Sequence, residues 1–257
     1  MRRETFPGSG PLRLDLKVPA GEVEVEAVES GEAVVELEAP RGDEQVVEDA
    51  RVELRGDELR VEVRDRRGAT EVRLRVAAPP GSALTAATAS ADLTARGSFG
   101  AAELKSASGD LELEHVAALR VKSASGDVRA GEVDGEARVQ IASGDVELAR
   151  VAGDAEISAA SGDIRVGEAR GAVKVQSASG DQRVDSVAAG RVELTSASGD
   201  VRVGIRRGSR VFIDARSASG DVDSELEVGD EPADEEGPLV ELKVTTMSGD
   251  IALVRAE

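Results

Sequence analysis

Short stretches of alternating apolar and polar residues run along most of the chain, and they predict β-strands. In residues 119–133, Leu119 and Val121 share one parity, a Ser-Gly-Asp turn follows, and Val128 and Ala130 restart the apolar set. Alternation with a period of two places side chains of one parity on one face of a strand. The same register returns in later stretches, so we expect each repeat to supply two short strands around a shared apolar interior.

The turn in this pattern is a Ser-Gly-Asp tripeptide that recurs about every 18 residues. Its copies end at Asp110, Asp127, Asp145, Asp163, Asp181, Asp200, Asp221 and Asp250, and a degenerate copy ends at Asp92. A fixed short period predicts units that stack on similar neighbours, because one unit cannot bury its apolar face alone. The predicted fold is therefore all-β: a single-chain β-solenoid, or β-helix, with coils of about 18 residues.

The two ends of the chain depart from this period. Residues 1–80 alternate less regularly, and we expect an irregular β-rich N-terminal cap that shields the edge of the first coil, with one short helix at 44–50. Residues 81–257 are expected to form the regular solenoid. The last two Ser-Gly-Asp copies are 29 residues apart, which predicts an acidic loop insertion at 224–237.

Charge and composition exclude several classes of function. The formal net charge is −19, and aromatic residues make up 1% of the chain. Nucleic-acid binding requires a basic surface and commonly uses stacking aromatics, so we expect no nucleic-acid partner. No stretch has the roughly 20 apolar residues of a membrane span, and no signal-peptide pattern is visible, so we expect a cytoplasmic protein without membrane insertion. The absence of cysteine excludes disulfides.

The Ser-Gly-Asp turn has a structural and a chemical interpretation. Glycine supplies a positive φ, and aspartate can accept backbone N–H bonds. Stacking would bring the carboxylates within about 5 Å of one another, where like charges repel unless something offsets them. A Ca²⁺ ladder would do so, and its weak candidate ligands are Asp110, Asp127, Asp145, Asp163, Asp181 and Asp200. Since Ca²⁺ takes six to eight oxygens, we prefer the structural interpretation and predict no cofactor.

A column of small residues stands three positions before each aspartate and points outward by parity. The neighbouring outward column contains no acidic residue, although the chain is strongly acidic. Small residues fit beside a crowded turn, but a flat face of this kind also suits docking of a partner. The candidate interaction face consists of Ala124, Ala142, Ala160, Ala178 and Ala197 with Lys122, Gln140 and Gln176.

Catalytic patterns are missing from the sequence. The only histidine, His115, is expected at a surface turn, and no cysteine nucleophile is available. There is no Gly-x-x-x-x-Gly-Lys-Ser/Thr loop and no zinc-ligand spacing. We therefore predict no catalytic residues, no cofactor-binding residues and no enzymatic activity.

The repeats also carry a resemblance to a known family. Repeated Ser-Ala-Ser-Gly-Asp-Val, preceded by Gly-Glu-Val-Glu-Val at 21–25 and Pro-Pro-Gly at 79–81, resembles the bacterial β-strand-repeat proteins of unknown function labelled putative adhesins. These are related to the toast-rack domains of cell-envelope stress proteins. The resemblance covers nearly the whole chain. It implies a β-solenoid and, for some members, a surface or envelope-stress role, and it carries over no catalytic residues.

Two functional hypotheses follow. The first is a non-catalytic scaffold or protein-interaction module that binds a protein partner or a second copy of itself. A homodimer would form through the terminal coil, which sequence order places after Asp250, or through the alanine face. The alternative is a Ca²⁺-responsive, adhesin-like surface protein that uses the aspartate ladder.

Overall fold

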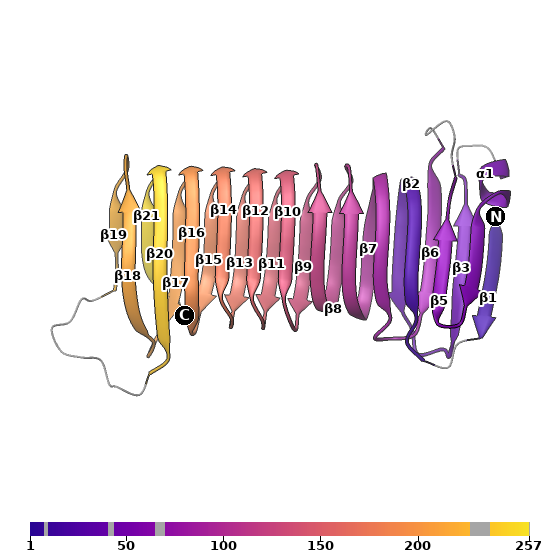
Figure 1. The fold of residues 1–257 in the computed structure, drawn as a ribbon, viewed down its shortest axis with the longest axis horizontal. Coiled ribbons are helices and arrows are strands. Elements are labelled where there is room, and N and C mark those ends of the chain that lie inside the picture. Colours follow the sequence, from indigo (N-terminus) through magenta and orange to yellow (C-terminus); the bar gives the residue numbers. More distant parts are fainter. Residues whose placement is uncertain (8–9, 41–43, 65–69, 227–236, 257) are drawn as a thin grey trace. The chain divides into compact units, whose positions relative to one another are not determined.

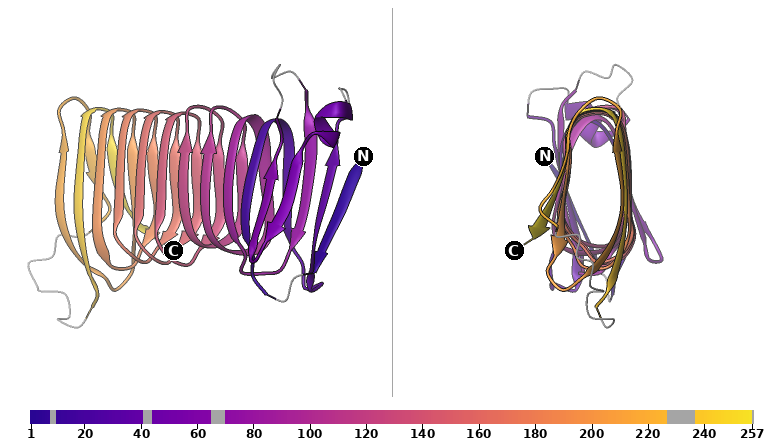
Figure 2. Two further views of the ribbon diagram at one scale, coloured as in Figure 1. Left: turned by 45° about the vertical axis from the view of Figure 1, so that its right-hand side comes forward. Right: turned by 90° about the vertical axis from the view of Figure 1, so that its left-hand side faces the viewer.

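The computed structural model describes residues 1–7, 10–40, 44–64, 70–226 and 237–256. Most of these residues are in strands, and they form two compact units, Met1–Ala130 and Gly131–Glu257 (Figure 1). The single helix of the described residues, α1 (Glu44–Glu48), lies within the stretch predicted to be helical. Within each unit, successive strands wind around one interior (Figure 2). The predicted all-β solenoid is confirmed.

The first unit combines long parallel strands with shorter antiparallel ones. Its strands are β1 (Arg2–Pro7), β2 (Arg13–Ala27), β3 (Glu32–Glu38), β4 (Arg51–Arg55), β5 (Glu58–Glu62), β6 (Val72–Ala78), β7 (Ala83–Ser106) and β8 (Leu111–Ser123), and β9 (Val128–Val133) begins in it. The antiparallel pairs β1–β3, β3–β6 and β4–β5 all involve strands that end by Ala78. The cap boundary at residue 80 stays a prediction, since the two compact units divide elsewhere.

Strand β2 pairs as a regular coil despite its place in the irregular segment. It runs parallel to β7, with Gly21 opposite Ala91 and Glu22 opposite Asp92. Gly21 has a φ of 114°, as the glycines of the regular turns do. The Gly-Glu-Val segment therefore stacks as an equivalent of Gly-Asp-Val.

The second unit contains parallel pairs throughout its described strands. They are β10 (Ala137–Ser143), β11 (Val146–Val151), β12 (Ala155–Ser161), β13 (Ile164–Ala169), β14 (Val173–Ser179), β15 (Gln182–Val187), β16 (Gly190–Ser198), β17 (Val201–Arg206), β18 (Arg210–Ser217), β19 (Val222–Ser224), β20 (Leu239–Ser248) and β21 (Ile251–Ala256). Even-numbered strands pair with even-numbered ones, and odd-numbered strands with odd-numbered ones. Each coil therefore contributes one strand to each of two walls.

The order of the last coils differs from their order in the sequence. Strand β16 pairs with β20, and β20 pairs with β18, so the C-terminal coil lies between the two coils that precede it in the chain. The expectation that the last coil in the sequence ends the stack is wrong, since β18 and β19 form the end coil. The inward residues of all these strands are similar aliphatics, so local pattern does not determine which coils become neighbours. The predicted acidic insertion at 224–237 falls largely on residues 227–236, outside the described residues.

The core is a set of aliphatic columns that run from coil to coil. Val139 faces Ile157 in the next coil, and Ile157 faces Val175, each at most 1% exposed. Full burial of such a side chain contributes roughly 1.5–3 kcal/mol. Gln182 interrupts the column between Ile164 and Val201, and it is 1% exposed. A narrow interior filled by Val, Leu, Ile and Ala explains why so few aromatic residues suffice.

Candidate functional site

The turn aspartates form a hydrogen-bonded ladder in each unit. The backbone N–H of Asp163 donates to Oδ1 of Asp145 at 2.9 Å, and the N–H of Asp181 donates to Oδ1 of Asp163 at 2.9 Å. The same contact at 2.9 Å joins Asp110 to Asp92, Asp127 to Asp110, Asp200 to Asp181, Asp250 to Asp200, and Asp221 to Asp250. One oxygen of each acceptor carboxylate therefore binds the backbone of the neighbouring coil, which offsets the repulsion between stacked charges.

The turn glycines are required for a second reason besides their backbone conformation. Gly162 has a φ of 117°, and a Cβ at this position would clash with the carbonyl oxygen of Gly144 in the neighbouring coil. Gly180 is placed in the same way over Gly162. The sequence indicates the positive φ, whereas the close approach of two turns becomes visible only in the stacked coils.

The ladder presents no recognisable metal cage. In the described part of the chain, no group of three or more His, Cys, Asp or Glu side chains is arranged to hold a metal ion. The candidates Asp110, Asp127, Asp145, Asp163, Asp181 and Asp200 lie one to a coil. Calcium binding by this ladder stays a prediction.

The predicted alanine face is exposed on the wall of even-numbered strands. In the second unit, Ala142, Ala160, Ala178 and Ala197 occupy equivalent exposed positions on β10, β12, β14 and β16. Pairing places Gln140, Ser158, Gln176 and Thr195 in register beside them. In the first unit, Lys122 and Ala124 are exposed near the end of β8. The outward direction agrees with the parity argument, while a docking role stays a prediction.

Met247 belongs to the same outward column, three positions before Asp250. It follows Ala197 in the stack and precedes Ala218, because β20 lies between β16 and β18. Its side chain is 66% exposed, so an apolar side chain projects from a row of small residues. The sequence shows Met247 in the column, but only the coil order gives it alanines on both sides.

The opposite wall of the second unit carries crossed ion pairs. Arg150 pairs with Glu132 and Glu168, and Arg165 pairs with Asp185 at 2.9 Å. The hydrogen bond from Arg170 lowers the pKa of Glu168 below its ordinary value, and Arg150 adds to this effect. The even-numbered wall carries a similar pair, Arg138 with Glu156 at 2.9 Å, beside its largely uncharged alanine columns.

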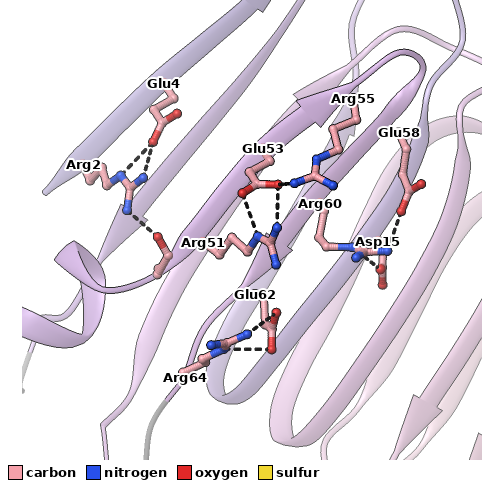
Figure 3. Close-up of polar contacts among 11 residues, drawn as sticks. Arg2, Glu4, Asp15, Arg51, Glu53, Arg55, Glu58, Arg60, Glu62 and Arg64 are labelled. Atoms are coloured by element: carbon pink, nitrogen blue, oxygen red, sulfur yellow. Dashed lines mark hydrogen bonds and ion pairs between the residues drawn. The ribbon is translucent and has the colours of Figure 1, made fainter.

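A similar network covers the strands near the N-terminus (Figure 3). Glu53 binds Arg51 at 2.8 Å and Arg55 at 2.9 Å, while Arg60 binds Asp15 at 2.9 Å. Arg51 lowers the pKa of Glu53 through their hydrogen bond. Since these side chains are partly exposed, such pairs contribute little to stability. Because each charge has an opposite charge beside it, this region presents no strong patch of one sign to a partner.

Arg2 has a structural role in the same region. It donates to the backbone oxygens of Glu48 at 3.1 Å and Ala50 at 2.6 Å, where the chain leaves α1. A cationic side chain at this point satisfies the free carbonyls of the helix end and interacts favourably with its dipole.

Two of the cavities in the first unit have mixed, charged linings. The larger has a volume of about 460 Å³, and its lining includes Glu22, Glu71, Arg73 and Asp92. Arg73 already donates to Glu22 at 2.7 Å. The second, of about 260 Å³, has a similarly mixed lining that includes Glu36. Ser90 also lines the larger cavity, whose charged groups include the Arg73–Glu22 ion pair.

His115 lies away from both cavities. Its Nδ1 is 2.9 Å from Oγ of Ser98, and its side chain is partly exposed in β8 rather than at a turn. The predicted turn position for His115 is therefore wrong, because β8 continues through Val116 to Ser123.

In the described ranges, no helix is long and apolar enough to cross a membrane.

Known proteins resemble this chain in their architecture. Among solved structures, a putative adhesin from Bacteroides fragilis NCTC 9343 matches with a TM-score of 0.50 and 12% identity, covering 98% of this chain and 96% of that chain. A putative lipid binding protein from Parabacteroides distasonis ATCC 8503 has a TM-score of 0.47 and 13% identity, with 99% and 96% covered. A putative adhesin from Parabacteroides merdae ATCC 43184 has a TM-score of 0.45 and 13% identity, with the same coverage.

At such identities the likeness to the Bacteroides structure concerns the fold alone. No curated protein matches the chain. The family described as Toastrack DUF4097 matches residues 13–254, nearly the whole length. This match agrees with the stacked coils and with the resemblance of the Ser-Gly-Asp repeats. The chain belongs to the Toastrack DUF4097 family.

Proposed function

We propose that this protein is a non-catalytic scaffold that docks a protein partner on the wall of even-numbered strands in its second unit. The observation that carries the proposal is the exposed alanine column beside a column of Gln140, Ser158, Gln176 and Thr195. These two columns contain no acidic side chain, in a chain with a net charge of −19. In the next outward column, Glu156 is paired with Arg138 at 2.9 Å, which reduces its repulsion of an anionic partner.

The energetics of the wall favour a flat, apolar or neutral partner surface. Alanine loses no side-chain entropy when it is covered, so contacts over this column cost little ordering. Met247 projects from the column and can fill a pocket on the partner, since methionine adapts its shape and often anchors promiscuous interfaces. The expected partner presents a strand or sheet face with one pocket for Met247.

An envelope-stress or surface role comes from the resemblance to related proteins and remains part of this proposal. Location in the cytoplasm, which the sequence suggests, also remains to be tested. Protease treatment of intact cells separates the two: degradation of the protein indicates the cell surface, and protection indicates an interior location.

Substitution of the wall tests the docking proposal. Ala142→Glu with Ala160→Glu places two carboxylates in adjacent coils of the column and should remove partner binding. Ala117→Glu with Ala149→Glu is the matched control, because both alanines are exposed but lie outside the column. Crosslinking in the native cell should capture the same partner with wild type and control, and lose it with the first variant. Equal capture by all three would overturn the proposal.

The thermal stability of these variants adds a necessary check. The midpoint of unfolding should change little in both, since exposed substitutions away from special features usually alter stability by less than about 0.5 kcal/mol. A large loss of stability only in the Ala142/Ala160 variant would show that the column has a structural role.

The Ca²⁺-responsive, adhesin-like function is the second proposal, supported by the stacked carboxylates alone. It requires that Ca²⁺ raise the midpoint of thermal unfolding. The bond from each acceptor carboxylate to a backbone N–H favours the scaffold, for which millimolar Ca²⁺ should leave the midpoint unchanged relative to EDTA.

A further inference from the structure

The end coil of the second unit has an open strand edge. Among the described residues, β18 pairs with β20 and with no strand on its other side. The N–H of Arg210 donates to Pro238 O at 2.9 Å, and the N–H of Ala218 donates to Thr246 O at 3.1 Å. Even-numbered residues of β18 therefore bond to β20. The N–H and C=O groups of odd-numbered residues point toward the open edge.

Burial falls sharply at this edge. Val211 and Ile213 face inward in β18 but are only half-buried, whereas Val240 and Leu242, their partners in β20, are at most 1% exposed. Four of the five exposed large hydrophobic side chains of the described residues lie in the last two coils: Phe212 at 67%, Met247 at 66%, Val222 at 46% and Leu239 at 44%. The end coil thus resembles an interior coil without its next layer.

We propose that a second copy of this chain covers this edge, with β18 of one protomer antiparallel to β18 of the other and centred on Phe212. In this register Phe212 faces its own counterpart, and Arg210 faces Asp214 of the partner subunit twice over. Val211 and Ile213 exchange backbone hydrogen bonds across the interface. The contact continues the sheet of the even-numbered wall and packs the exposed Phe212 against its counterpart.

Hydrogen-bond parity and charge together select this register. Only registers that join odd-numbered residues use the free backbone groups. Centring on Ile213 would place Arg210 opposite Arg216, and centring on Asp214 would place two carboxylates opposite each other. Centring on Ala215 would also pair opposite charges, Asp214 with Arg216, but it would place Phe212 opposite Ala218, beyond the end of β18 at Ser217, and leave the exposed phenylalanine without an apolar partner. The Phe212-centred register pairs opposite charges and like apolar residues over the first five positions of β18.

The symmetry of this contact predicts a closed dimer. An isologous contact uses the same surface on both chains, so no further copy can add through it. A head-to-tail contact between opposite ends would instead produce filaments whose length grows with concentration. The inference does not depend on the alanine wall, because it uses a different surface and a different partner.

A disulfide trap tests the geometry directly, because the chain contains no cysteine. Residues opposite each other in a non-hydrogen-bonded antiparallel pair have Cα atoms about 4.5 Å apart, within the span that a disulfide bridges. Phe212→Cys should therefore form a covalent dimer on mild oxidation at micromolar concentration. Ala160→Cys, an exposed position on the alanine wall, is the matched control and should remain monomeric on a denaturing gel.

Charge exchange tests the register. Asp214→Arg should weaken the dimer about tenfold, because two favourable pairs become repulsive. Arg210→Asp combined with Asp214→Arg should restore it, since the exchanged charges again face each other. Sedimentation of the full-length protein measures the dissociation constant of wild type and both variants, and circular dichroism confirms that each is folded.

Different results would reject the dimer and its register. A monomer at every concentration, a filament, or a preferred crosslink through Ala160→Cys would each reject the β18 dimer. A dimer that the double exchange fails to restore would reject the register. Loss of partner capture by the alanine-wall variants, with the dimer intact, would support the proposed docking function separately.

Discussion

The backbone N–H of Asp181 donates to Oδ1 of Asp163 at 2.9 Å, so each turn is held by the carboxylate of its neighbour. Two like-charged residues in adjacent coils are thereby linked through one carboxylate and one amide. The charge of the acceptor strengthens the bond, while its repulsion for the next carboxylate weakens the stack. Substitutions at Asp163 can separate these two effects.

Replacing Asp163 tests whether the acceptor or the charge matters. Asp163→Ala removes the acceptor of the Asp181 N–H and should lower the free energy of unfolding by about 1 kcal/mol. Asp163→Asn keeps an acceptor oxygen and removes one charge from the ladder, so its stability should lie near that of wild type. Urea denaturation measures both. Equal losses in the two variants would show that the charge itself is required.

Gly162→Ala tests the close approach of the turns. The alanine would have to adopt a disfavoured positive φ, and its Cβ would clash with the Gly144 carbonyl oxygen. We therefore expect the free energy of unfolding to fall by more than about 2 kcal/mol. Gly208→Ala is the control, because Gly208 has a φ of 86° but its new Cβ would meet no atom of the described residues within 4 Å. Thermal unfolding should show a clearly smaller loss for Gly208→Ala, and similar losses would attribute the effect to φ alone.

Gln182→Leu should stabilise the protein. Nε2 of Gln182 donates to Thr195 O at 2.9 Å, but its buried Oε1 has no hydrogen-bond partner among the described residues. An unpaired buried polar atom costs about 1–3 kcal/mol, so the aliphatic side chain should raise the midpoint of unfolding. Ile164→Gln, the reverse change one coil away, should lower it. A loss of stability in Gln182→Leu would show that its single hydrogen bond outweighs the unpaired oxygen.

The ion pairs of the odd-numbered wall predict a pH dependence. Hydrogen bonding from Arg170 lowers the pKa of Glu168 in the folded protein. A lowered carboxyl pKa stabilises the fold above the unfolded value, and this contribution is lost as the pH falls through the folded value. Wild type should therefore be more stable than Glu168→Gln at pH 7, and the difference should begin to shrink as the pH falls below about 4.3, the ordinary value for a glutamate. A difference in melting temperature that stays constant down to the lowest pH at which both proteins fold would contradict this origin.

Asp185 provides an independent measurement of the same effect. Partial burial opposes ionisation, but hydrogen bonds from Arg183 and Arg165 outweigh it and hold the pKa of Asp185 below its ordinary value. Asp185→Asn should therefore show the same convergence with wild type at low pH. Asp223→Asn offers a control, because Asp223 is exposed on β19 at the end coil.

Much of the fold could be predicted because its signals are local. Alternation places Val139, Ile157 and Val175 inward, and the structure buries all three. The outward direction of Ala142 and Ala160 follows from the same parity. The conformation of Gly162 follows from its place in a tight turn, since only glycine adopts a positive φ freely.

The ladder and the wall show where local signals end. The turn chemistry predicts that Asp163 accepts a backbone N–H, but a turn by itself does not specify that the donor belongs to the next coil. The repeat places Met247 in the small-residue column, but its alanine neighbours Ala197 and Ala218 depend on the pairing of β20. The repeat pattern does not predict what the aspartate ladder or the alanine wall binds.

The sequence alone determined the coil length, the inward register and the need for glycine at each turn, because these depend on residues close together in the chain. Only the tertiary structure decided that β20 and β21 enter between earlier coils and that β18 is left with an open edge. Every coil presents nearly the same aliphatic face, so many stacking orders satisfy the local pattern. Packing of whole coils against one another selects among them, and that selection creates the surface at Phe212.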